Sequence, residues 1–244
     1  MKTPSADQHA PDLFKILRVL VDRPGVPARF LVLASASPAL LQQSSESMAG
    51  RIEVIEIGGF TLDEIGAANA APLWLRGGFP RSFTAARDQG SVVWRREFIR
   101  ATVERDLLQL GVNVAAPALY RFWAMLAHYH GQVWNAAEPA RSLGVKEGTV
   151  RRYLDLLTQA HLIRQLQPGF VNLGKRQVKA PKIYFRDCGL LHSLLGIGDA
   201  AALARHPRYG ASWGDSRSTR CCGSRSPMRP ISGRPTRARS STCR

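Results

Sequence analysis

Residues 147 to 161 read EGTVRRYLDLLTQAH, and this stretch does most to decide the expected fold. Its apolar side chains Val150, Leu154 and Leu157 recur at intervals of four and three residues, which predicts a helix with one buried face. The two consecutive arginines at positions 151 and 152 fall outside that apolar stripe. We therefore expect an amphipathic helix whose exposed face is basic.

The neighbouring segments extend this helix into a recognisable pattern. We expect helices over residues 118–130 and 135–143, a turn at Gly144, and strands over residues 162–166 and 182–185. Three helices followed by a β-hairpin are typical of the winged helix-turn-helix. The sequence therefore predicts such a domain over residues 117–195.

The N-terminal part of the chain shows a different pattern. Residues 12–21, DLFKILRVLV, have the spacing of an amphipathic helix, with Leu13, Ile16, Leu17 and Leu20 as its expected apolar stripe. The short apolar runs RFLVL at residues 29–33 and RIEVIEI at residues 51–57 are typical of strands in a parallel sheet. We therefore predict an α/β fold for residues 1–70.

The middle of the chain is expected to be helical. Residues 59–115 show helical patterning, interrupted by a glycine- and proline-containing turn at residues 77–80. We interpret residues 71–116 as a helical connector. The predicted fold class is therefore α/β plus α, with a winged helix-turn-helix after the connector.

The charge is strongly basic and unevenly distributed. The chain of 244 residues has a formal net charge of +16, and residues 117–195 carry 11 basic and 4 acidic side chains. A positive balance of this size favours contact with nucleic-acid phosphates. No apolar run approaches the roughly 20 residues of a membrane span, and the N-terminus lacks a secretory signal. We expect a cytoplasmic protein with no membrane partner.

The candidate DNA-binding residues lie in two places in the predicted winged helix. The recognition helix would present Lys146, Thr149, Arg151 and Arg152, and the wing would present Lys175, Arg176 and Lys179. A second reading stays open, since winged helices also bind proteins and a basic face can simply be solvated. In that reading Arg151 pairs with Asp155, four residues further along the helix.

No catalytic or metal-binding set is expected. The six histidines form no HxH or HExxH arrangement, so a metal site is not supported. The acidic residues around Arg105, in the run Glu104-Arg105-Asp106, lack a partner at useful spacing and are interpreted as a helical surface cluster.

Several short motifs in this chain resemble a known family. They are HAPDLF at residues 9–14, FLVLASASP at 30–38, ESMAGR at 46–51, RGGFP at 76–80, ERD at 104–106 and GASW at 210–213. Together they resemble the prokaryotic AAA-superfamily P-loop ATPases that carry a C-terminal domain of unknown function, made of a winged helix and a restriction-endonuclease-like fold. The resemblance implies that residues 1–70 are the C-terminal part of a P-loop AAA domain.

The resemblance also implies nucleotide-sensing roles for two residues. In intact relatives, which would use ATP and Mg²⁺, Ser35 would lie near the γ-phosphate and Arg51 would read the nucleotide or a neighbouring subunit. The alternatives are an ordinary small-residue turn at Ser35 and an ion pair of Arg51 with Glu53 or Glu46.

The chain departs from the family pattern at both ends. It contains no GxxxxGK[ST] loop, and Ser5 and Ala6 occupy the positions of the two acidic residues expected before Gln8. We therefore predict that this chain does not hydrolyse ATP and needs no cofactor. Residues 196–244 are interpreted as a linker and a disordered tail, translated out of frame from about residue 214, where eight arginines and one aspartate follow.

Two functions are compatible with these patterns. The first is a fragment of an AAA-type ATP-binding protein whose winged helix contacts DNA. The alternative is an independent DNA-binding or protein-interaction module that self-associates through an α/β scaffold.

Overall fold

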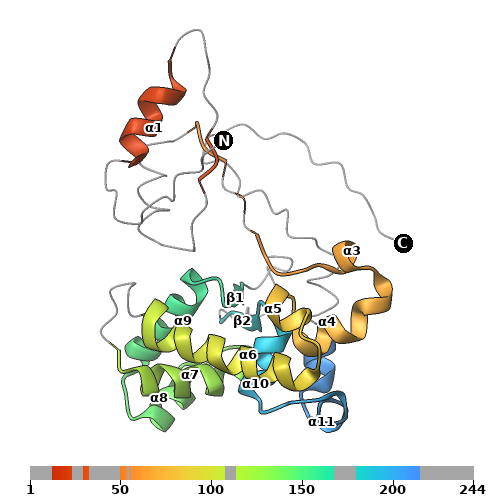
Figure 1. Cartoon of the computed structure of the whole chain (residues 1–244). Coiled ribbons are helices and arrows are strands. Elements are labelled where there is room, and N and C mark those ends of the chain that lie inside the picture. The colour runs from red at the N-terminus through yellow and green to blue at the C-terminus, as the bar shows by residue number, and fades with distance from the viewer. Residues whose placement is uncertain are drawn as a thin grey trace, which may run out of the picture. The chain divides into compact units, whose positions relative to one another are not determined.

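The computed structural model describes residues 13–23, 30–32, 50–53, 55, 57–107, 114–167 and 180–214. The chain divides into two compact units (Figure 1). Of the described residues, those up to 55 belong to unit 1 and those from 57 onward belong to unit 2. The predicted disordered tail from residue 215 onward lies outside the described residues.

Unit 1 contains the helix α1, Leu13–Val21, as predicted from the amphipathic pattern. Its buried side chains are Phe14 and Leu17, which pack with Val21 and Val32. The buried face differs from the predicted stripe, because Ile16 is 57% exposed. The spacing located the helix, but the residues available to cover it decided which face is buried.

The predicted α/β fold class is wrong. The described residues within 29–33 and 51–57 form no strand, and Leu31 and Ile57 are 76% and 81% exposed. In the described part of the chain helices dominate and one sheet occurs, with two antiparallel strands. Among the described residues, no arrangement of elements corresponds to a P-loop AAA domain. A short apolar run forms a buried strand only where neighbouring strands satisfy both of its edges, and no described segment does so.

Unit 2 is built mainly from helices. Its first half contains α3 (Leu62–Ile65), η1 (Ala67–Asn69), α4 (Ala70–Arg76), α5 (Pro80–Phe83), α6 (Asp88–Ala101) and η2 (Thr102–Asp106). Its second half contains α7 (Ala116–Ala127), α8 (Ala137–Leu143), α9 (Glu147–Gln159), β1 (Ile163–Leu166), β2 (Lys182–Phe185), α10 (Cys188–Leu194) and α11 (Ala200–Arg205). The three helices and two strands predicted between residues 118 and 185 are therefore confirmed to within three residues.

The two strands form a hairpin with a third segment beside it. Strands β1 and β2 are antiparallel, with Ile163 opposite Phe185. On the other edge of β2, the Gly131 N–H donates to the Ile183 carbonyl at 2.7 Å, and the Ile183 N–H donates to the Gln132 carbonyl at 3.1 Å. Strand β2 is thus hydrogen-bonded on both sides, which anchors the segment between α7 and α8.

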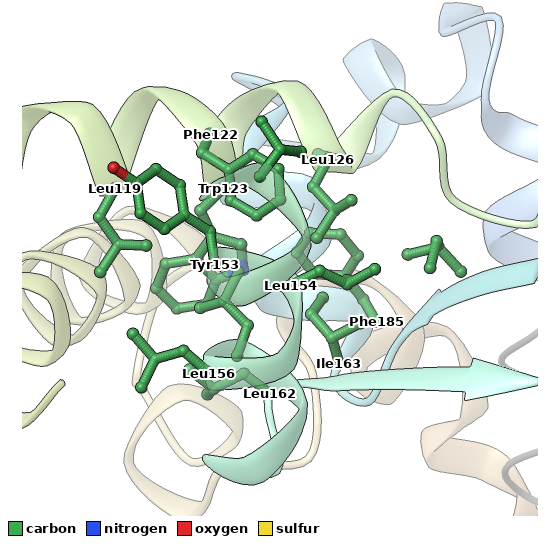
Figure 2. Packing of buried hydrophobic residues seen from close by; sticks show 14 of the residues in the cluster. Leu119, Phe122, Trp123, Leu126, Tyr153, Leu154, Leu156, Leu162, Ile163 and Phe185 are labelled. Atoms are coloured by element: carbon green, nitrogen blue, oxygen red, sulfur yellow. The ribbon is translucent and has the colours of Figure 1, made fainter. Parts of the chain in front are cut away.

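The main core lies between α7, α9, β1, β2 and α10. Figure 2 shows Phe122 and Trp123 of α7 packed with Leu154 of α9 and Phe185 of β2. Phe122 and Trp123 are fully buried. The same core includes Ile99, Val103 and Leu107 from α6 and the end of η2. Residues from the predicted connector and from the predicted winged helix therefore share one core.

Two glycines permit a close approach between the end of α4 and the start of α10. Gly77 has a φ of +80°, and a Cβ there would collide with the Asp187 carboxylate. A Cβ on Gly189 would collide with the Arg76 carbonyl oxygen. Only glycine has room at these two positions, which explains part of the RGGFP motif.

Among the described residues, no helix combines the length and the apolar character needed to cross a membrane.

Candidate nucleic-acid interface

Helices α8 and α9 are joined by a tight turn of three residues. Helix α8 ends at Leu143, and the next residue, Gly144, adopts the left-handed conformation with φ 68° and ψ 31°. The Val145 N–H then donates to the Ala140 carbonyl at 3.0 Å, so the turn satisfies a carbonyl at the helix end. Short turns of this kind, often with glycine, join the helices of helix-turn-helix units.

Helix α9 has one apolar and one charged face. Val150, Leu154 and Leu157 are buried, as the spacing predicted, and Figure 2 shows Leu154 directed into the core. Lys146, which precedes the helix, and Arg151 and Arg152 on its second turn are all exposed. Thr149 is half-buried between them. The structure therefore places all four described recognition-helix candidates on or beside one helix.

The ion pairs of α9 differ from the predicted one. Arg151 pairs with Glu147 at 3.5 Å, one turn earlier, and both side chains are exposed. Asp155 instead accepts a hydrogen bond from the Gln165 side chain at 3.2 Å. Lys146 and Arg152 make no ion pair with any described residue. These two cations are the clearest excess positive charge on α9.

Of the remaining predicted site residues, four lie outside the described residues and one belongs to unit 1. Lys175, Arg176 and Lys179 lie outside the described residues, as does Ser35. Arg51 belongs to unit 1, where its Nε donates to the Asp22 carboxylate at 2.7 Å. That hydrogen bond raises the pKa of Arg51. Asp22 is a partner that the sequence did not suggest, and Glu46, one of the two suggested partners, lies outside the described residues.

The acidic residues give no metal site in the described part of the chain, where no group of three His, Cys, Asp or Glu side chains could hold an ion. The cluster around Arg105 is exposed, and Arg105 pairs with Asp106 at 3.1 Å. This arrangement is the helical surface cluster that the sequence predicted.

A buried polar junction that sequence reasoning missed holds α4, α6 and α10 together. Arg95 is 1% exposed, and its Nη1 donates to the carbonyls of Leu75 at 3.1 Å and Gly189 at 2.8 Å. Burial lowers the pKa of this guanidinium, against the opposing effect of Asp187. A signal existed, because Arg95 lies on the apolar stripe of α6 between Val92 and Ile99.

Asp187 caps α10 and links it to the end of α4. Its carboxylate accepts hydrogen bonds from the backbone N–H groups of Leu190 at 2.8 Å and Gly78 at 2.7 Å. Burial raises the pKa of this carboxyl, while these hydrogen bonds and Arg95 act in the opposite direction. The sequence signal for this residue was an aspartate directly before the segment that forms α10, a position that favours side chains able to cap the helix.

His192 and Ser212 form a second buried pair that sequence reasoning missed. The His192 Nε2 lies 2.7 Å from the Ser212 Oγ, and the His192 Nδ1 lies 3.1 Å from the Leu75 carbonyl. A carbonyl only accepts, so Nδ1 carries the proton and Nε2 accepts from Ser212. The Trp74 indole N–H donates to the Ser212 Oγ at 2.9 Å, completing the chain. Both His192 and Ser212 are essentially inaccessible, so this pair is structural.

Residues 69–201 match the family described as "Domain of unknown function (DUF8612)". The chain belongs to this family. The matched DUF8612 domain begins at the end of η1 and reaches the first residues of α11. It therefore contains the α8–α9 pair, Arg95, Asp187 and His192, whereas Ser212 follows it.

The chain is also similar to longer mycobacterial proteins. An uncharacterised protein of Mycobacterium bovis and one of Mycobacterium tuberculosis are each 58% identical to it over 206 residues. The aligned region is 84% of this chain and 47% of each relative. The chain thus spans about half the length of the curated relatives it matches. No solved structure matches the chain.

Proposed function

We propose that the DUF8612 domain of this chain binds DNA through the exposed face of α9, as the second helix of a helix-turn-helix unit. The observation that supports this proposal is the exposed cation set at the start of α9. The set consists of Lys146, which is the last residue of the turn between α8 and α9, and of Arg151 and Arg152, which follow within the first two helical turns of α9. In helix-turn-helix proteins the first turns of the second helix contact the base edges.

The charges on α9 suit a phosphate backbone. Lys146 and Arg152 have no ion pair with a described residue, so a phosphate would be their first strong partner. The pair of Arg151 with Glu147 is exposed, and such pairs contribute at most about 1 kcal/mol. Arg151 could therefore exchange Glu147 for a phosphate at little cost.

Other parts of the expected function remain proposals. The wing contacts by Lys175, Arg176 and Lys179, and with them the winged-helix interpretation, stay predictions, as does self-association. Binding of DNA requires no cofactor, and we propose that this chain hydrolyses no ATP. It would act in the cytoplasm, where it has access to DNA.

The experiment compares two double variants of the full chain. Fluorescence anisotropy with a labelled duplex of about 20 base pairs measures the affinity as a function of salt concentration. The test variant is Lys146→Ala with Arg152→Ala, and the matched control is Arg87→Ala with Arg105→Ala, which removes the same charge from exposed positions elsewhere. All variants keep the arginine-rich segment after residue 214, so any binding by that segment is a shared background.

We expect the α9 variant to bind at least about tenfold more weakly than the control at 100 mM salt, since each phosphate contact contributes to affinity. The number of phosphate contacts is obtained from the slope of log affinity against log salt concentration. We expect this number to fall by about 2, because two phosphate contacts are lost. Equal affinities and slopes for the two variants would rule out α9 as the DNA-binding surface.

A further inference from the structure

A cavity of about 730 Å³ lies between α6, η2, α7 and α10 in unit 2. Pockets that hold small molecules span about 300 to 1,000 Å³, so this one is large enough for a ligand of that class. None of the residues predicted to contact DNA lines it. The cavity is thus separate from the α9 face.

The wall formed by η2 has an unusual backbone. The Leu107 N–H donates to the Thr102 carbonyl at 2.9 Å, five residues earlier, which makes this a π-helical turn. Such turns are rare and are frequent at functional sites, because the extra residue widens the helix and redirects side chains. Here the turn places Val103 and Glu104 in the cavity wall directly after Arg100 of α6.

The cavity has an excess of positive charge. Arg100 pairs with Glu97 at 3.8 Å and with Glu104 at 3.4 Å, and the lining as a whole has three arginines and two glutamates, a net charge of +1. Arg96 from α6 and Arg121 from α7 also line the cavity and are exposed. Neither makes an ion pair with any described residue. The cavity therefore offers two guanidinium groups to an anion.

The rest of the wall supplies apolar contacts. Ile99 and Val103 are buried beneath the cavity, and Tyr120 is 48% exposed at its edge. The Ser193 hydroxyl from α10 is buried and has no hydrogen-bond partner among the described residues. That oxygen is inaccessible from the cavity, so the wall acts on a ligand through its apolar side chains and Tyr120.

We propose that this cavity binds a small organic phosphate with an aromatic body. Its phosphate would pair with Arg96 and Arg121, whose planar donors match phosphate oxygens. Its ring would lie against Tyr120 and the aliphatic floor formed by Ile99 and Val103. The net charge of +1 in the lining favours an anionic phosphate over a neutral ligand.

Isothermal titration calorimetry on the full chain tests this proposal, with phenyl phosphate as the probe. Inorganic phosphate and phenol each supply one half of the probe. We expect phenyl phosphate to bind at least about tenfold more tightly than either half, because only it uses both the arginines and the apolar wall.

Variants separate the cavity from general surface charge. We expect Arg96→Ala with Arg121→Ala to weaken phenyl phosphate binding at least about tenfold. The control Arg105→Ala removes an exposed arginine of η2 that does not line the cavity, and it should bind as the unmodified chain does. Thermal melting checks that each variant is folded.

Two results would overturn the proposal. One is the absence of saturable binding of phenyl phosphate by the unmodified chain up to about 10 mM. The other is equal weakening by the cavity double variant and by Arg105→Ala, which would assign the binding to non-specific attraction by a basic protein.

Discussion

At the junction of α4 and α10, Gly77 and Gly189 have no space for a larger side chain. The Gly189 backbone lies against the Arg76 carbonyl, so that a Cβ would meet backbone atoms rather than a flexible side chain. The same junction holds the Arg95 guanidinium and the Asp187 carboxylate. We therefore expect substitutions here to affect the stability of unit 2 far more than substitutions at exposed glycines.

The first prediction compares two Gly→Ala changes. Gly189→Ala should lower the free energy of unfolding by about 2–4 kcal/mol, because the backbones must separate. Gly148→Ala in α9, where a Cβ meets nothing within 4 Å, should be neutral or stabilising by up to about 1 kcal/mol. Urea denaturation measures both, and equal values would contradict the close packing at Gly189.

The second prediction concerns pH. Burial lowers the pKa of His192 and of His130 from 6.5 to about 4. The unfolded chain therefore binds more protons than the folded one between these values, and stability is lost as the pH falls from about 6.5 to 4. Above pH 6.5 none of this stability is lost. By pH 4.5 the loss amounts to about 2–3 kcal/mol per histidine.

Urea denaturation at pH 7 and pH 4.5 measures this effect. The variant His192→Gln should be less stable at pH 7 but should lose about 2–3 kcal/mol less on acidification than the unmodified chain. His128→Gln, a change at an exposed histidine, is the control and should leave the pH dependence unaltered. An unaltered dependence in the His192 variant would show that His192 is not buried as a neutral group.

At the scale of elements, α6 is attached to α4 and α10 through one arginine. The Arg95 side chain spans from its own helix to the carbonyls of Leu75 and Gly189. Removal of this charge would take the Arg95 donor away from both carbonyls, of which Leu75 would keep His192, and would leave Asp187 without this nearby cation.

The third prediction is that Arg95→Met destabilises the chain by about 3–5 kcal/mol, because it removes buried hydrogen bonds and leaves the buried Asp187 carboxylate without this nearby positive charge. Arg96→Met at the next, exposed position is the matched control and should change stability by less than about 0.5 kcal/mol. Differential scanning calorimetry of both variants measures the difference, and equal melting temperatures would show that Arg95 contributes no net attachment.

At the scale of the whole molecule, the core of unit 2 joins two ranges that the sequence separated. Ile99, Val103 and Leu107 pack in one cluster with Leu119 and Phe122 of α7. The DUF8612 match, residues 69–201, likewise extends across both ranges. These observations favour residues 57–214 as the unit that folds cooperatively.

The fourth prediction compares two shorter chains. Residues 57–214 alone should melt in one cooperative transition, because their core lies within that range. Residues 117–195 alone should show no sharp transition, since they lack the α6 and η2 side chains that cover α7. Circular dichroism during heating distinguishes the two, and a sharp melt of residues 117–195 would show that the winged-helix range folds by itself.

The helices and strands between residues 118 and 185 were predictable because their signals are local. The spacing of Val150, Leu154 and Leu157 and the glycine at 144 specify a turn and a helix without reference to distant residues. The exposed position of the α9 cations followed from the same periodicity. The partner of Arg151 did not, because Glu147 and Asp155 are equally close in sequence and only the side-chain contacts decided between them.

The sequence by itself determined the basic charge, the α7 to β2 order of elements and the polar face of α9, because periodicity and charge are properties of neighbouring residues. Three features required the tertiary structure: the described residues of the apolar runs 29–33 and 51–57 form no strand, Arg95 is buried, and four elements line an open cavity. Strand pairing, burial of a charge and enclosure all depend on segments far apart in the chain. Local sequence patterns do not specify which distant segment will pair with a strand, bury a charge or line a cavity.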